Sequence, residues 1–185
     1  MNIYFTASVV GRDQHLDHYK LISKIVTDKG HTIFADHILN ISENEIHLKT
    51  EKERLDFHHK LEGWIESCDF MIVEASFPSI SVGYEVSMAL QRGKPVLILY
   101  SEGHPPSLFA YHENDRLVCE KYNTTNLSEI IDTFIDYVKG VHDSRFTFFI
   151  TPRIATYLEE VSREEKIPKS VYLRKLIDED MKSHG

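Results

Sequence analysis

The chain has 185 residues, of which 42% are hydrophobic and 11% aromatic, a composition typical of an ordinary soluble globular protein. Its formal net charge is −8, and residues 141–185 hold eight basic and eight acidic side chains, so the acidic excess lies in the first 140 residues. That excess argues against a body that coats nucleic acid. No apolar run is long enough for a membrane span and the chain opens directly into a predicted strand, so we expect a cytoplasmic protein.

Neither the cysteines nor the histidines have the spacing of a metal site. Cys68 and Cys119 stand alone beside apolar segments, which predicts buried free thiols in a reducing compartment. The eleven histidines are scattered, and the pair His58-His59 has no further ligand at a suitable spacing. We therefore expect neither a metal nor an organic cofactor.

Short apolar strands alternate with amphipathic helices through the first 140 residues. Strands are predicted over Asn2–Ala7, Thr32–Ala35, Phe70–Glu74, Pro95–Tyr100 and Leu117–Glu120. Helices are predicted over Leu16–Lys29, Arg54–Ser67, Tyr84–Arg92 and Leu127–Lys139. This alternation predicts an α/β domain with a doubly wound parallel sheet, Rossmann-like or flavodoxin-like.

A second, smaller unit is predicted after Gly140. Arg145–Pro152 alternates with Phe146, Phe148 and Ile150 on one face, which predicts a strand, and helices are predicted over Arg153–Lys166 and Ser170–Lys182. One strand and two helices cannot bury a core alone. The pattern resembles a ribbon–helix–helix module, in which two copies pair their strands. We therefore expect domains at 1–140 and 141–185 and at least a homodimer.

The most informative stretch joins the third predicted strand to the third predicted helix. The apolar block Phe70–Val73 predicts a strand buried on both faces, and Pro78, Gly83 and neighbouring serines predict the loop after it. A helix predicted from Tyr84 places Glu85 in its first turn, at the mouth of the crevice where α/β sheets bind ligands. First-turn acids are also common as stabilising charges, so position alone leaves both readings open.

Five segments follow one another in the order found in the nucleoside 2-deoxyribosyltransferase superfamily, which the chain resembles over residues 1–138. They are Ile3–Gly11, Ala35–Ile38, Trp64–Asp69, Pro78–Glu85 and Gly93–Val96. The branch most similar to the chain is that of the 2′-deoxynucleoside 5′-phosphate N-hydrolases. The resemblance implies cleavage of the base–sugar bond of (deoxy)nucleoside 5′-monophosphates. Such a reaction passes through an oxocarbenium-like sugar, which a carboxylate beside the anomeric carbon stabilises or traps.

The resemblance also implies roles for individual residues. Glu85 matches the family nucleophile. Ser79 stands where the phosphate-handling hydrolases have a serine and the free-nucleoside transferases an aspartate, so it favours a nucleotide substrate. Val10 occupies the position of the family's phosphate-loop arginine, and Arg12 is the nearest replacement cation. The remaining positions assigned to substrate binding are Ser8, Gly11, His37, Gly83 and Tyr84, of which Tyr84 can equally be a packing residue.

One departure from the family puts catalysis in doubt. The family's aspartate that helps to protonate the departing base corresponds to Leu61, and general acid help is typically worth about 10²–10⁴ in rate. His58 lies one helical turn earlier on the same face and is the best substitute, whereas Glu62 points about 100° round the helix. Three outcomes follow: a slow hydrolase, a hydrolase with a substituted acid such as His58, or a binding domain without catalysis.

The leading hypothesis is therefore a nucleotide N-glycosidase that forms a homodimer or a higher homo-oligomer. The alternative is a catalytically impaired nucleotide-sensing regulator that binds DNA, and a third reading is a glycohydrolase for a larger nucleotide such as NAD. In ribbon–helix–helix repressors the outward strand side chains enter the major groove. Here these are Arg145, Thr147 and Phe149, a thin set for base readout, so we favour a dimerisation tail over DNA binding.

Overall fold

The structure is a computed structural model, and it describes residues 1–40, 50–106, 109, 114–140, 150–165 and 169–184. The chain forms two compact units, Met1–Asp143 and Ser144–Gly185. In the described part of the chain, no helix is both long and apolar enough to cross a membrane.

The first unit is built on a parallel sheet of five strands. They are β1 (Asn2–Ala7), β2 (Thr32–Phe34), β3 (Phe70–Glu74), β4 (Val96–Tyr100) and β5 (Leu117–Lys121). Their spatial order is β2-β1-β3-β4-β5, which confirms the predicted doubly wound sheet in its flavodoxin-like form. The chain changes direction between β1 and β3, where Ala7 lies beside Glu74 at the carboxyl ends of the strands. In such sheets this switch point is where ligands bind.

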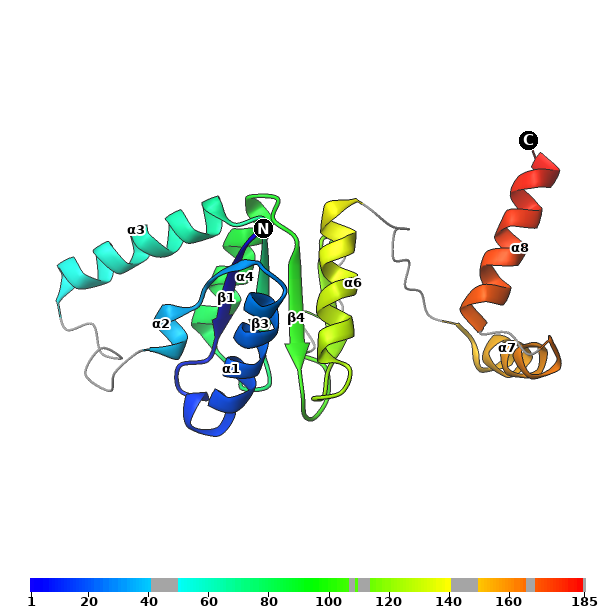
Figure 1. Ribbon diagram of the computed structural model, residues 1–185, viewed down its shortest axis with the longest axis horizontal. Helices are drawn as coiled ribbons and strands as arrows, with labels where there is room; N and C mark the ends of the chain where they lie inside the picture. Colours follow the sequence, from blue (N-terminus) through cyan, green and yellow to red (C-terminus); the bar gives the residue numbers. More distant parts are fainter. Residues whose placement is uncertain (41–49, 107–108, 110–113, 141–149, 166–168, 185) are drawn as a thin grey trace. The chain divides into compact units, whose positions relative to one another are not determined.

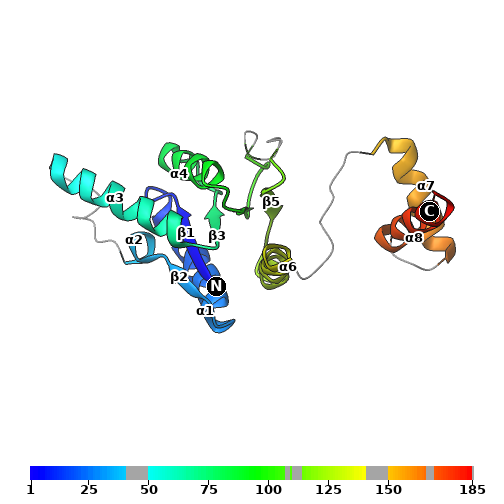
Figure 2. The same ribbon diagram turned by 90° about the horizontal axis from the view of Figure 1, so that it is seen from above.

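Helices cover both faces of the sheet (Figure 1 and Figure 2). The helices of the first unit are α1 (Arg12–Asp28), α2 (Asp36–Leu39), α3 (Glu51–Ser67), α4 (Ile80–Gln91) and α6 (Leu127–Lys139). Helices α1 and α6 pack on one face and α3 and α4 on the other. Neighbouring strand residues face opposite layers, since Ile72 joins the first apolar cluster and Met71 the second. All five residues of β3 are buried, as predicted for a central strand.

The start of α4 differs from the prediction in a way that matters for the site. The helix begins at Ile80, because the Ser79 side chain caps it by accepting a 3.4 Å hydrogen bond from the Val82 backbone N–H. Glu85 therefore lies in the second turn, and its predicted first-turn position is wrong. Its carboxylate gains less from the helix dipole there, because the dipole effect fades beyond the first turn.

Two other helices of the first unit begin three or four residues earlier than predicted. Helix α1 starts at Arg12, since the backbone N–H groups of Gln14 and His15 already bond to the Gly11 carbonyl. Helix α3 starts at Glu51 through a capping box: Thr50 Oγ1 accepts from the Glu53 N–H, and the Glu53 carboxylate accepts from the Thr50 N–H. The short helix α2 was not predicted at all.

The second unit contains two packed helices, α7 (Pro152–Glu165) and α8 (Lys169–His184). Leu158 and Tyr172 are buried between them, and the Tyr157 and Tyr172 hydroxyl groups lie 3.0 Å apart. Several large apolar side chains nevertheless stay exposed in the single chain: Ile154, Leu176, Ile177 and Met181. The predicted strand and its residues Arg145 and Thr147 lie outside the described residues, apart from the strand's last positions.

Candidate active site

Glu85 is directed inward from α4 toward the sheet. Its side chain is 7% exposed, and Oε2 accepts a 3.0 Å hydrogen bond from the Tyr4 hydroxyl on β1. Burial raises the pKa of the Glu85 carboxyl, and the nearby Thr6 and Tyr4 hydroxyl groups oppose that shift. A desolvated carboxylate held by a hydroxyl donor at the carboxyl end of a parallel sheet is well placed to act as a nucleophile.

His37, in α2, joins this pair through Tyr4. Its Nε2 lies 3.0 Å from the Tyr4 hydroxyl oxygen. Because the single Tyr4 proton is donated to Glu85, the Tyr4 oxygen accepts from Nε2–H, which leaves His37 Nδ1 as a bare acceptor. Burial lowers the pKa of His37 to about 4, so the imidazole is neutral at physiological pH.

Aromatic rings pack around His37. The His37 ring stacks on Tyr4 with the centroids 5.3 Å apart and on Trp64 with the centroids 4.9 Å apart. Phe57 packs against both His37 and Trp64. Rings of this kind offer flat surfaces against which a nucleobase can stack.

Unpaired polar atoms gather at the carboxyl ends of β1, β2 and β3. Among the described residues, the buried side-chain atoms without a hydrogen-bond partner are Thr6 Oγ1, Arg12 Nε, His37 Nδ1 and Glu74 Oε2. Thr6 Oγ1 lies close enough to lower the pKa of Glu85, yet its contact there does not have normal hydrogen-bond geometry. Buried polar atoms in folded proteins are nearly always paired. These unpaired atoms lie on both faces of the sheet, because Thr6 faces the layer of α3 and α4 whereas Glu74 bonds to Tyr122 in the layer of α1 and α6.

The loop between β1 and α1 is tightly shaped. Ser8 is buried and its Oγ accepts a 3.2 Å hydrogen bond from the Gly11 N–H. Gly11 packs so closely on Phe77 that an added Cβ would lie 2.5 Å from the Phe77 Cβ. Arg12 donates a 3.0 Å hydrogen bond from Nη2 to the Leu39 carbonyl at the end of α2. Ser8 and Gly11 thus fix the loop, and Arg12 places a cation between α1 and α2.

The structure puts Leu61 and His58 in different surroundings. Leu61 is buried in the apolar cluster that also contains Tyr4 and Val82. His58 is exposed, and its Nε2 lies 3.2 Å from the hydroxyl of Tyr84, which is itself exposed. Glu62 lies 3.5 Å from His58 Nδ1 and 3.1 Å from Arg92. His58 and Tyr84 therefore form a pair at the surface between α3 and α4.

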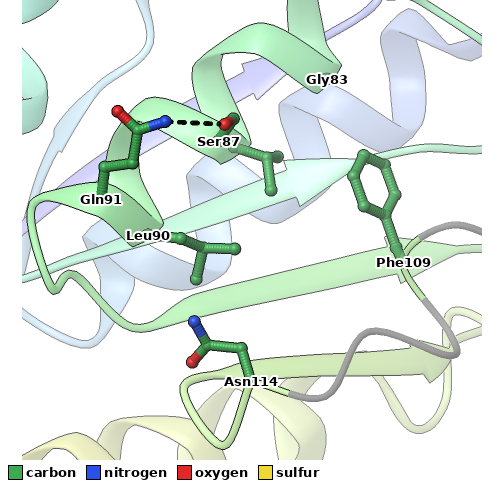
Figure 3. Close-up of a pocket in the computed structure, with 7 residues that line it drawn as sticks. Gly83, Ser87, Leu90, Gln91, Phe109 and Asn114 are labelled. Carbon is green, nitrogen blue, oxygen red and sulfur yellow. Dashed lines mark hydrogen bonds between the residues drawn. The ribbon is translucent and has the colours of Figure 1, made fainter.

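A cavity of about 360 Å³ lies elsewhere on α4 (Figure 3). It is lined by Gly83, Val86, Ser87, Leu90, Gln91, Phe109 and Asn114. Glu85 is not among these residues. Gly83, which the resemblance assigned to substrate binding, lines this cavity.

Sequence reasoning missed three residues near the candidate site: Tyr4 and Thr6 lie beside Glu85, and Trp64 stacks on Tyr4. A signal for two of them was present, because Tyr4 and Thr6 are spaced by two in a strand with apolar neighbours and so face the same layer. Hydroxyl groups on the buried face of a strand need partners, and here they lie beside the catalytic candidate.

Comparison with known proteins gives this geometry a context. Residues 3–133 match the nucleoside 2-deoxyribosyltransferase family, and residues 144–184 match a ribbon-helix-helix domain. A Methanococcoides burtonii protein, named as a candidate 2′-deoxynucleoside 5′-phosphate N-hydrolase, is 31% identical over 101 residues, covering 54% of this chain and 80% of the relative. A 5-hydroxymethyl-dUMP N-hydrolase of Tetraodon nigroviridis is 24% identical over 146 residues, covering 75% and 100%.

Two solved structures share the fold. A CMP N-glycosidase of Clostridium botulinum superposes with a TM-score of 0.50 at 15% identity, covering 71% of this chain and 99% of that one. A 2-deoxyribosyltransferase of Bacillus psychrosaccharolyticus superposes with a TM-score of 0.52 at 17% identity, covering 69% and 90%. The parallel sheet of the first unit and the family match over residues 3–133 agree with one another. The chain therefore belongs to the nucleoside 2-deoxyribosyltransferase family and carries a ribbon-helix-helix domain at its carboxyl-terminal end.

Proposed function

We propose that this protein is an N-glycosidase that hydrolyses the base–sugar bond of (deoxy)nucleoside 5′-monophosphates, with Glu85 as the nucleophile. The observation that carries the proposal is the Glu85 carboxyl, which is buried, accepts a hydrogen bond from Tyr4 and lies near the unpaired Thr6 hydroxyl. Relatives named as nucleotide N-hydrolases support the substrate class.

The reaction takes place in two displacements. A Glu85 carboxylate oxygen attacks C1′ of the sugar, the C1′–N bond breaks, and its electron pair leaves with the base, which takes up a proton. Water then attacks C1′ and gives a proton to the group that protonated the base; the bond from C1′ to the Glu85 oxygen breaks, which releases the sugar phosphate and restores the carboxylate. Tyr4 holds Oε2 throughout and orients the other oxygen toward the sugar.

We assign the proton donor for the departing base to His58. Leu61 cannot donate a proton, and the lowered pKa of His37 leaves that imidazole neutral. His58 is exposed to solvent on α3 and lies beside the Tyr84 hydroxyl and Glu62. His58→Gln is therefore expected to lower kcat by about 10²-fold or more if His58 is the acid.

The 5′-phosphate would be held by hydroxyl and amide donors. Ser79 accepts from Val82, which leaves its own proton for a phosphate oxygen, and the N-terminus of α4 adds backbone N–H groups. Ser8 and Gly11 shape the facing loop and Arg12 supplies the positive charge. The absence of an acid at position 79 favours a phosphate over a free hydroxyl there.

We propose that the carboxyl-terminal unit is a dimerisation tail and that the protein works in the cytoplasm. Exposed apolar residues on α7 and α8 support pairing with a second copy. Both cysteines are free thiols, which suits a reducing compartment. DNA binding through Arg145 and Thr147 is the alternative role of the tail.

The second candidate function is a nucleotide-sensing regulator that has lost catalysis. It is favoured by two observations together, the apolar burial of Leu61 and the ribbon-helix-helix match. Under this reading the crevice still binds a nucleotide, and binding changes the affinity of the tail for DNA.

One experiment separates these functions. The protein is incubated with ribo- and deoxyribonucleoside 5′-monophosphates, the matching nucleosides and NAD, and released base is measured by chromatography, with Glu85→Ala as control. Base release from monophosphates that is lost in the control supports the glycosidase. Tight nucleotide binding without release, together with a salt-dependent DNA shift lost in Arg145→Ala, supports the regulator. Release from NAD alone supports the larger-nucleotide reading.

A further inference from the structure

A second buried acid, Glu74, lies at the carboxyl end of β3 on the sheet face opposite Glu85. Its side chain is 1% exposed and is surrounded by residues of the layer that holds α1 and α6, whereas Glu85 belongs to the layer of α3 and α4. Burial raises the pKa of the Glu74 carboxyl, and the Ser76 hydroxyl, His15 and the Tyr122 hydroxyl oppose the shift. The proposed mechanism makes no use of Glu74.

Two series of hydrogen bonds between side chains end on one oxygen of Glu74. Oε1 accepts from the Tyr122 hydroxyl at 3.1 Å and from the hydroxyl and backbone N–H of Ser76. Because Tyr122 gives its proton to Glu74, its oxygen accepts from Nδ1–H of His18 at 2.8 Å. Likewise Ser76 Oγ accepts from the hydroxyl and the backbone N–H of Ser101.

These hydrogen bonds join parts of the fold that are distant in sequence. Ser76 follows β3, Ser101 follows β4, Tyr122 follows β5 and His18 belongs to α1. Glu74 Oε1 is the point on which all four converge. A buried carboxylate is a costly group to keep, so its use as a common acceptor indicates that the geometry at this edge of the sheet is fixed by it.

The geometry that Glu74 fixes includes the walls of the phosphate site. Ser76 lies three residues before Ser79, which caps α4 and faces the proposed phosphate position. Between them, Phe77 packs against Gly11 of the opposite loop. A shift of the turn at 75–79 would therefore move Ser79 and loosen Gly11, whereas Tyr4 holds Glu85 independently from the other face.

We propose that Glu74 is a positioning residue that sets the turn 75–79, and with it the 5′-phosphate contacts, without acting on the anomeric carbon. The kinetic part of this inference rests on the proposed glycosidase function. Its structural part, the ordering of the turn, stands apart from any activity.

The kinetic test compares three variants. Glu74→Leu removes the acceptor, and the KM for a nucleoside 5′-monophosphate is expected to rise about tenfold or more while kcat changes less than about threefold. Glu74→Gln keeps an acceptor oxygen and is expected to restore a KM close to that of the wild type. Ser76→Ala removes the hydroxyl that links Glu74 to the turn and is expected to reproduce the rise in KM. This variant also provides the test if Glu74→Leu does not fold.

Tyr122→Phe is the matched control. It removes the hydroxyl that links Glu74 to His18 of α1 and leaves the hydrogen bond between Ser76 and Glu74 intact. Its KM is expected to stay near the wild-type value. A lower melting temperature for Glu74→Leu with unchanged KM would show a merely structural role, and a fall in kcat at constant KM would place Glu74 in the chemistry. Either result overturns the proposal.

Amide hydrogen exchange of the protein without substrate tests the structural part separately. Exchange at Ser76–Val82 is expected to be faster in Glu74→Leu than in Glu74→Gln and the wild type. Equal exchange in all three proteins overturns the inference. If the wild type releases no base from any nucleotide, the proposed function fails, but this comparison still decides whether Glu74 orders the turn.

Discussion

The Tyr4 hydroxyl and the Glu85 carboxylate meet at 3.0 Å although 81 positions separate them along the chain. The contact forms because β1 and β3 are neighbours at the switch point of the sheet, and α4 follows β3 directly in the chain. The hydroxyl is thus carried by a buried interior strand. The proposed nucleophile takes its orientation from that strand.

Tyr4→Phe is expected to lower kcat/KM by about ten- to a hundredfold, since a hydrogen bond to a charged group contributes about 1.5–3 kcal/mol. The same change removes a bond that lowers the pKa of Glu85. The acid limb of the pH profile should therefore move to higher pH. Tyr137→Phe, which removes a hydroxyl bonded to the Asp115 carbonyl at the surface, is the control. An unmoved acid limb in Tyr4→Phe would contradict this role.

In the wild type, kcat/KM is expected to fall on acidification at a pH above the ordinary glutamate value of 4.5, because burial raises the pKa of Glu85 and the nucleophile must be ionised. The measurement is a kcat/KM profile from pH 4 to pH 8 with a monophosphate substrate. An acid limb centred at or below pH 4.5 would show that the ionisation of another group controls kcat/KM.

Glu85→Gln is expected to stabilise the protein at neutral pH while abolishing turnover. A carboxyl whose pKa is raised on folding binds its proton more tightly in the folded state, so its ionisation opposes folding above the raised pKa. This penalty disappears as the pH falls through the raised pKa toward 4.5. The difference in melting temperature between variant and wild type should therefore shrink over the same range. If the wild type were more stable than the variant at pH 7, the expected destabilising effect of the ionised Glu85 would be refuted.

Leu61→Asp is expected to increase kcat, by up to about 10²-fold, because it returns a general acid to the position of the family aspartate. The new acid replaces a side chain buried in the cluster with Tyr4 and Val82, so unfolding free energy should fall by about 2–5 kcal/mol. Leu61→Asn, similar in size but unable to donate a carboxyl proton, should show the stability loss without the gain in kcat. Equal rates for both variants would mean that position 61 does not reach the departing base.

Ile177→Glu should convert a dimer into a monomer, as measured by analytical ultracentrifugation. Ile177 is 60% exposed in the single chain and shares α8 with other exposed apolar residues. A charge in a buried helix interface is costly. Glu179→Lys, a change between exposed charges on the same helix, should leave the association state intact, and a monomeric wild type would contradict the dimerisation proposal.

The sheet and most of its helices were predictable because hydrophobic period and strand length carry that information locally. Strands Asn2–Ala7 and Phe70–Glu74 were predicted with their observed ends, and each contains an unbroken apolar run, Ile3–Phe5 and Phe70–Val73. Predictions of where helices start were less accurate, because a helix start depends on the side chain that caps its first N–H groups. Thr50-x-x-Glu53 carried its signal in the sequence, whereas the start at Ile80 depended on whether Ser79 turned toward Val82.

The site was predictable only in part. Glu85 was found through the family motif, but its partner Tyr4 depends on which strands become neighbours, and no local pattern encodes that. The neutral state of His37 depends in the same way on burial by Trp64 and Phe57, which come from another helix. The convergence of Ser76, Ser101 and Tyr122 on Glu74 joins three strand ends and was likewise invisible in the sequence.

The contact between Gly11 and Phe77 has an evolutionary consequence. Any side chain at position 11 would collide with the Phe77 Cβ, an atom that every residue other than glycine possesses. Shortening Phe77 to alanine would therefore not make room, and only a displacement of one loop or a glycine at position 77 would. Natural variants are expected to keep glycine at position 11 whatever their nucleobase preference, while the residues around Trp64 remain free to diverge.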